Sequence, residues 1–142
     1  MLSFCSRIIL TVFGWKTELS IPVVKKIVLI GAPHTTNWDF PLTLLSLSAM
    51  NIRFNWVAKH TLFWWPLGSF FRIIGGIPVD RSSGTAFLKN IIGLFKSRDA
   101  FILAIAPEGT RAKAKYWKTG FYMIAENAGV PIGLGYIDYS RK

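Results

Sequence analysis

Residues 27–41 read IVLIGAPHTTNWDFP, and this stretch decides the fold. Its first half is an apolar, β-branched run, which is typical of a strand buried in a parallel sheet. Its second half turns polar and ends on Pro41, a residue that is tolerated in the first turn of a helix. We therefore predict a strand over 27–32, then a loop, then a helix that begins between Asn37 and Phe40 and runs toward residue 50.

The same alternation of strands and helices continues along the chain. Further strands are predicted at 54–58, 76–79, 101–106 and 130–136. Helices are predicted at 63–74 and at 121–128, the latter ending before Gly129. A third helix is predicted to begin after a cap at Ser82 or Ser83, and its apolar positions at helical spacing are Phe87, Leu88, Ile91, Ile92 and Phe95. This order predicts an α/β layered fold with a largely parallel sheet and helices on both faces. Because another helix would normally follow the last strand, we expect that the domain is truncated at its C-terminus.

The length of 142 residues fits one domain, with an N-terminal amphipathic lead-in over 1–26 and an α/β core over 27–142. If the N-terminus is helical, one narrow face is polar or small and apolar residues cover the remainder; the polar face holds Ser3, Arg7, Thr11 and Gly14. Such a helix either lies on a bilayer or packs against its own domain, and the sequence leaves both open. No apolar run reaches about 18 residues, so we predict no transmembrane helix.

The composition is both apolar and basic. Half of the chain (51%) is hydrophobic, which excludes a disordered protein, and 17 Lys plus Arg against 7 Asp plus Glu give a formal net charge of +10. This balance favours anionic partners, and the high apolarity favours a membrane surface over nucleic acid. Cys5 is the only cysteine, so no intrachain disulfide can form, and we interpret it as a small apolar residue on a helix face.

The loop after the first predicted strand carries the pattern HxxxxD, formed by His34 and Asp39. Histidine can take and return a proton near neutral pH, and a carboxylate beside it can orient the ring. The two side chains can meet only if His34 lies in the loop and Asp39 in the first helical turn. Alone, the pattern fits a surface histidine followed by an acidic helix start better than a catalytic pair. His60 has no comparable partner and is interpreted as a surface or boundary residue.

Cations and a second acidic residue follow other predicted strands, at the edge of a parallel sheet where ligands bind. The segment PEGTR supplies Glu108, Gly109, Thr110 and Arg111, where glycine permits close backbone approach and arginine can bind a phosphate bidentately. The segment GGIPVDR supplies Arg81, and Lys59 ends another predicted strand. A basic surface loop would explain PEGTR alone, with Lys113, Lys115 and Lys118 nearby, but not the convergence of several strand ends.

In this order, HxxxxD, GGIPVDR, PEGTR and then Val-Pro-Ile at 130–132 resemble the glycerolipid acyltransferases typified by 1-acyl-glycerol-3-phosphate acyltransferase. The resemblance implies transfer of a fatty acyl group from coenzyme A or acyl carrier protein to a hydroxyl of a lysophosphatidate-like acceptor, in phospholipid biosynthesis. It implies that His34 is the general base and that Asp39 orients it. It further implies that acceptor binding falls to Arg81, Glu108, Gly109, Thr110, Arg111 and, less directly, Lys59.

Thioester acyl transfer needs no metal and no bound cofactor, because the thioester is itself a co-substrate. The expected partners are acyl-CoA or acyl carrier protein, an anionic lyso-lipid, and the cytoplasmic face of a membrane in a peripheral contact, without nucleic acid. The aromatic residues Phe63, Trp64, Trp65, Phe70 and Phe71 line an acyl groove, dip into the bilayer, or pack in the core. Two alternatives stay open: an acyltransferase acting on another lyso-lipid acceptor, and a non-catalytic basic module that binds lipid or nucleic acid.

Overall fold

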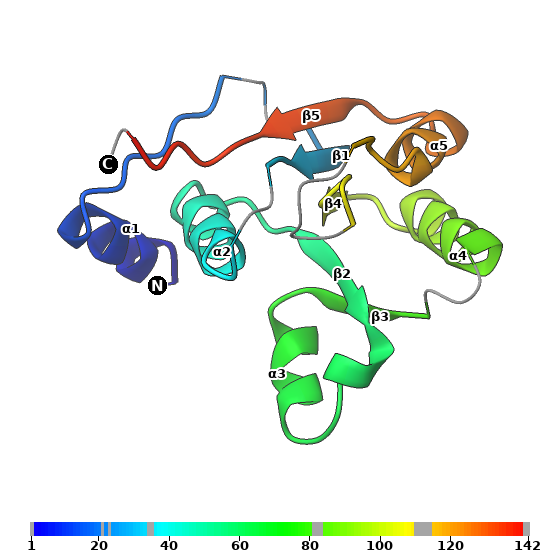
Figure 1. Ribbon diagram of the computed structural model, residues 1–142, viewed down its shortest axis with the longest axis horizontal. Coiled ribbons are helices and arrows are strands. Elements are labelled where there is room, and N and C mark those ends of the chain that lie inside the picture. The colour runs from blue at the N-terminus through cyan, green and yellow to red at the C-terminus, as the bar shows by residue number, and fades with distance from the viewer. Residues whose placement is uncertain are drawn as a thin grey trace.

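The computed structural model describes the chain except residues 1, 21, 23, 34, 35, 81–83, 110–114, 141 and 142, and the side chain of residue 2. The described part forms a five-stranded parallel sheet in the order β3-β2-β4-β1-β5 (Figure 1). The strands are β1 (Lys26–Gly31), β2 (Asn55–Lys59), β3 (Gly76–Val79), β4 (Phe101–Ile105) and β5 (Ile132–Gly135). The helices are α1 (Leu2–Val12), α2 (Asp39–Ala49), η1 (His60–Leu62), α3 (Leu67–Ile73), α4 (Gly84–Ser97) and α5 (Gly120–Ala128).

One face of the sheet is covered by α4 and α5. These helices bury apolar residues at helical spacing, because a 3.6-residue repeat returns every third or fourth side chain to the same stripe. The resulting core joins Ile91 and Phe95 of α4 and Ile124 of α5 to Val28 and Leu103 of the sheet. The predicted C-terminal stop of the last helix is confirmed, since Gly129 adopts a left-handed conformation at φ 65°.

The opposite face is covered by α2 and α3. In β2, the side chain of Val57 packs on the α4/α5 core, so its neighbour Trp56 points to the other face of the pleated strand. There the Trp56 ring lies 4.4 Å from Phe40 of α2 and 5.6 Å from Phe71 of α3, between ring centroids. Helices therefore cover both faces, and the predicted α/β layered fold with a parallel sheet is confirmed.

The N-terminal helix packs against α2, which confirms one of the two placements considered above. Its inner face holds Ser6 and Leu10, both buried, and the Arg7 guanidinium Nε donates a hydrogen bond of 2.8 Å to the carbonyl of Ala49. Its outer face keeps apolar residues in solvent: Phe4, Ile8, Ile9, Val12 and Phe13, beside the exposed thiol of Cys5. The buried stripe of α1 is therefore narrow and mixes polar with apolar side chains, while most of its apolar residues stay exposed.

The bounds of two elements differ clearly from the sequence prediction. The predicted helix at 63–74 is confirmed as the shorter α3, Leu67–Ile73, which begins directly after its N-cap Pro66. The 3-10 turn η1, His60–Leu62, precedes the predicted range. The last strand covers only Ile132–Gly135 instead of 130–136. The caps proposed at Ser82 and Ser83 lie outside the described residues.

Replacing Leu103 by alanine tests the central position of β4. Leu103 is 0% exposed, so the variant leaves a cavity and should lower the free energy of unfolding by about 2–5 kcal/mol. The matched control is Leu19→Ala, at a leucine that is 42% exposed, which should change stability by about 0.5 kcal/mol at most. Urea denaturation near neutral pH measures both; equal losses in the two variants would contradict this placement of the core.

Candidate functional site

The candidate site lies where the strand order of the sheet reverses direction. After β1 the chain crosses to β2 on one side of the sheet, and after β4 it crosses to β5 on the other side. Because β1 and β4 are hydrogen-bonded neighbours, the loops that leave their carboxyl ends separate and open a crevice. The HxxxxD segment follows β1 and the PEGTR segment follows β4, so the fold brings the two motifs to adjacent strand ends.

Asp39 is the first residue of α2 and is only 6% exposed. A buried carboxylate is costly unless it accepts hydrogen bonds, and here donors surround it. The backbone N–H of Thr36 donates to Oδ2 at 2.8 Å, and the Thr36 hydroxyl donates to Oδ1 at 3.2 Å. The Tyr139 phenol, one hundred residues away in sequence, donates to Oδ1 at 2.5 Å. These contacts fix the carboxylate at the carboxyl edge of β1.

Tyr139 is held in turn by the segment that follows α1. The indole of Trp15 packs edge-on against the Tyr139 ring, with 5.3 Å between ring centroids and an interplanar angle of 84°. Partial burial of the phenol, together with its hydrogen bond to the Asp39 carboxylate, raises the pKa of Tyr139 above its ordinary value of 10.0. The phenol therefore stays protonated, as a donor to Asp39, across the physiological pH range.

Glu108 and Gly109 form the turn that leaves β4. Gly109 has a φ of 63°, a left-handed conformation that favours glycine, and the Lys118 side chain lies so close that an added Cβ would meet its Nζ at 2.9 Å. The backbone N–H of Lys118 donates to the Pro107 carbonyl at 2.8 Å, which closes the segment back onto the strand end. The turn therefore brings together a carboxylate, a glycine backbone and a lysine side chain.

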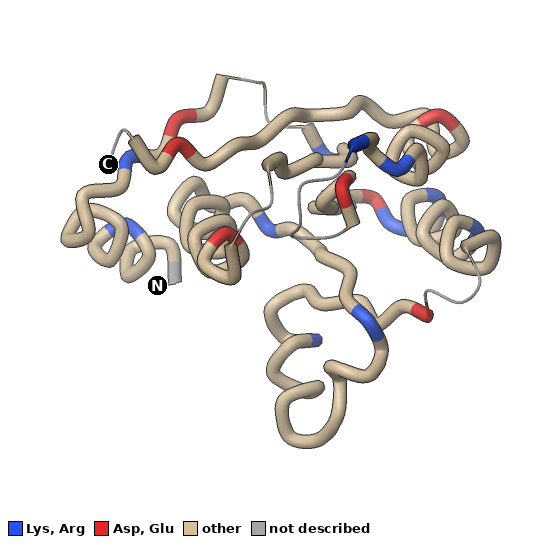
Figure 2. The backbone as a smooth tube through the Cα atoms, viewed as in Figure 1, with Lys and Arg blue, Asp and Glu red and all other residues tan. Residues whose placement is uncertain are grey.

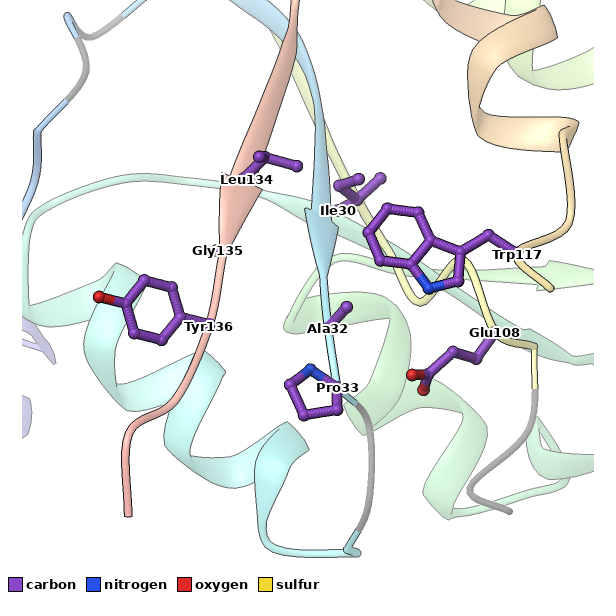
Figure 3. A pocket seen from close by; sticks show the side chains of 8 residues that line it. All are labelled: Ile30, Ala32, Pro33, Glu108, Trp117, Leu134, Gly135 and Tyr136. Atoms are coloured by element: carbon purple, nitrogen blue, oxygen red, sulfur yellow. The ribbon is translucent and has the colours of Figure 1, made fainter. Parts of the chain in front are cut away.

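A cavity of about 420 Å³ lies between the carboxyl ends of β1, β4 and β5. Figure 3 shows the Glu108 carboxylate directed toward Pro33, and the Trp117 ring lying beside Ile30. Apart from Glu108 the lining is mostly apolar or aromatic: Ile30, Ala32, Pro33, Trp117, Leu134, Gly135 and Tyr136. Its volume lies in the usual range of small-molecule sites, about 300–1,000 Å³, and its walls suit an apolar chain.

The other residues proposed from the sequence fall into two groups. Lys59 ends β2, which pairs with β4, so Lys59 and Glu108 leave neighbouring strands at the same edge of the sheet. His34, Arg81, Thr110 and Arg111 lie outside the described residues. Described residues flank two of these positions. His34 falls in sequence between Gly31, the end of β1, and Thr36, which donates to Asp39. Arg81 follows Val79, the end of β3, by two positions.

Sequence reasoning missed Tyr139, Trp117 and Leu134. All three follow or belong to elements recognised from sequence, but none carries a motif. The signal that could have found Tyr139 is topological: in a parallel sheet the segment after the last strand returns to the same edge as the other strand ends. No residue after the last strand was included among the predicted site residues.

Comparison with known proteins identifies a family. A family model described as acyltransferase matches residues 17–133, which include every strand except the end of β5. Neither the curated proteins nor the solved structures gave a match.

The Tyr139→Phe variant tests the phenol–carboxylate hydrogen bond through the pH dependence of stability. Since the folded state raises the phenol pKa, Tyr139 stabilises the fold fully below about pH 10, the unfolded value, and loses that contribution as pH rises through the folded value. The free energy of unfolding, measured by urea denaturation, should therefore fall less steeply above about pH 10 in the variant than in the parent.

The matched control is Tyr122→Phe, which removes an exposed phenol on α5 that contacts Glu126 at 3.4 Å. Equally steep alkaline loss in the parent and in Tyr139→Phe would count against the hydrogen bond.

Proposed function

The chain belongs to the acyltransferase family, and we propose that it moves a fatty acyl group from an acyl-CoA or acyl carrier protein thioester to a hydroxyl of a lysophosphatidate-like acceptor in phospholipid biosynthesis. The main support is the Asp39 carboxylate, buried and hydrogen-bonded by Thr36 and Tyr139 at the end of β1. A fixed carboxylate five residues after a histidine suits the orientation of a general base. The apolar cavity with Glu108 at the adjacent strand end offers room for an acyl chain.

In the proposed reaction, His34 takes the proton of the acceptor hydroxyl while the hydroxyl oxygen bonds to the thioester carbonyl carbon. Asp39 accepts a hydrogen bond from the imidazole and stabilises the imidazolium that forms. The tetrahedral intermediate then collapses, the carbon–sulfur bond breaks, and the thiolate leaves with the proton from His34. The products are the ester and the free thiol, and the enzyme returns to its starting protonation state.

Charge divides the binding roles around this centre. A carboxylate repels a phosphate, so we assign Glu108 to the acceptor's hydroxyl-bearing end, next to the left-handed turn at Gly109. Thr110, the next residue in sequence, is assigned to the same end of the acceptor. The phosphate falls to the cations Lys59, Arg81 and Arg111, which offer charge-assisted hydrogen bonds. Backbone N–H groups after β1 are the proposed donors to the developing oxyanion. In this assignment the cavity between β1, β4 and β5 takes the acyl chain.

The proposed setting is peripheral, at the cytoplasmic face of a membrane, where lipid acceptors reside. In the described residues no helix is long and apolar enough to cross a bilayer. Within the same family, another lyso-lipid acceptor is the main alternative. A non-catalytic lipid- or nucleic-acid-binding module is the alternative outside it, and it leaves the Asp39 hydrogen-bond network without a role.

The His34→Ala variant tests the general base. The purified chain is incubated with acyl-CoA or acyl carrier protein thioester and a panel of lyso-acceptors, and product is detected by mass spectrometry. Loss of the base should lower the transfer rate by about 10²–10⁴-fold while acceptor binding survives. His60→Ala is the matched control, because His60 is the only other histidine and lies exposed in η1. Equal product from His34→Ala and the parent would remove His34 from the mechanism.

The Arg111→Ala variant tests the phosphate clamp. Losing a hydrogen bond to a charged group costs about 1.5–3 kcal/mol, so the acceptor KM should rise roughly 10- to 150-fold while the donor KM changes little. Arg53→Ala serves as control, since Arg53 is exposed and precedes β2, at the opposite edge of the sheet. An unchanged acceptor KM in Arg111→Ala, or the same shift in an acceptor without phosphate, would argue against the clamp.

A further inference from the structure

Residues 60–75, here named the aromatic lobe, connect β2 to β3 and project from the body of the domain (Figure 1). The lobe comprises η1, a turn and α3. Its inner side is well packed: Phe63 and Phe71 both contact Trp56 of β2, and the Trp56 indole N–H donates to the Ile74 carbonyl at 3.1 Å. The lobe is therefore an ordered part of the fold.

Its outer side exposes large apolar side chains to solvent. Trp65 is 83% exposed and Ile73 is 82% exposed, and the remaining members of the set are Leu62, Trp64, Leu67 and Phe70. Single exposed apolar residues are ordinary on protein surfaces, but six within twelve positions of sequence on one projection are not. Since the inner aromatics already fill the contact with β2, these outer residues are not needed for the core.

The charge of the lobe indicates what covers this surface. No Asp or Glu occurs between Asp39 and Asp80, whereas Lys59 stands at the base of the lobe and Arg72 lies on it. Figure 2 shows the same segregation, with basic and no acidic positions on the lobe. The Arg72 guanidinium lies over the Phe63 ring at 5.4 Å from its centroid, which keeps this cation next to the aromatic residues. Tryptophans beside basic residues suit the interface of an anionic bilayer.

We infer that the aromatic lobe is a membrane-docking surface, which inserts its exposed apolar side chains into an anionic bilayer and places Arg72 at the lipid phosphates. A second copy of the chain is a poorer occupant, because two facing lobes would oppose like charges with no acidic partner on either. The inference deepens the proposed function, since a docked lobe would bring a lipid acceptor to the strand ends. Docking itself requires no catalysis and is tested without substrate.

Vesicle flotation measures the docking directly, with the whole chain and no acyl donor. The parent should bind vesicles of phosphatidylglycerol and phosphatidylcholine more tightly than pure phosphatidylcholine vesicles, and the binding should weaken as salt rises from about 0.05 M to about 0.5 M. The Trp65→Ser/Ile73→Ser double variant should partition at least about tenfold more weakly, because it removes two apolar side chains from the buried contact. Both residues are more than four-fifths exposed, so the fold should survive, as far-UV circular dichroism checks.

The matched control is Tyr122→Ser/Met123→Ser, a pair of exposed apolar residues on α5, at the opposite face of the sheet. A second comparison, between two single variants, separates the effect of charge from that of apolarity: Ile73→Glu should weaken binding to anionic vesicles more than Ile73→Lys does.

Unchanged flotation of the Trp65→Ser/Ile73→Ser variant would overturn the inference, and binding by the parent would then have to come from another surface such as α1. A parent dimer in ultracentrifugation that this variant dissociates, without vesicle binding, would assign the lobe to self-association instead. Acyl transfer without docking would reject this inference alone, and docking without transfer would reject the proposed function alone.

Discussion

The parallel pairing of β1 with β4 is the interaction on which the rest of the structure depends. Five residue pairs, from Lys26 with Phe101 to Ile30 with Ile105, hold these strands side by side at the centre of the sheet. Their crossovers leave toward opposite sides, so the following loops cannot cover the strand ends and a crevice remains. Two motifs about seventy positions apart in sequence become neighbours through this pairing. Any change that altered it would separate the two halves of the candidate site, even with every side chain preserved.

The Asp39 carboxylate shows how the periphery of the fold supports this centre. Its local contacts include the donor Thr36, as in many helix starts that carry an acidic residue. The phenol of Tyr139 adds a donor from beyond β5, and Trp15 packs against that phenol from beyond α1. Both ends of the chain thus converge on one carboxylate. A hydrogen bond to a charged group is stronger than one between neutral groups, so this contact ties the termini to the site more firmly than apolar packing alone.

Much of the fold follows from local sequence. The run at 27–32 predicted a buried parallel strand, because burial on both faces leaves a continuous apolar run. The spacing of Ile91 and Phe95 predicted an amphipathic helix, because burial of one stripe leaves a helical period. What sequence could not supply was the strand order, which depends on long-range pairing. For that reason Tyr139 was missed, since only the β1–β5 pairing brings its segment to Asp39. The face on which α1 packs was also beyond reach, because a helix pattern does not say which side its neighbour occupies. His34, Arg81, Thr110 and Arg111 remain predictions from sequence.

The site and the aromatic lobe are linked by chain geometry as well as by proposed role. Lys59 is the last residue of β2 and the lobe begins at the next residue, so no linker separates the strand end from the lobe. A strand advances about 3.3 Å per residue, and the ends of neighbouring parallel strands lie about 4.8 Å apart. The base of the lobe therefore stands within one or two side-chain lengths of the strand ends that carry Glu108. An amphiphilic substrate has the same division, with an apolar tail and a polar end that reacts. A rigid connection between an apolar projection and a polar crevice would let such a substrate reach the crevice while its tail remains in lipid, so that only the polar end must be desolvated for reaction.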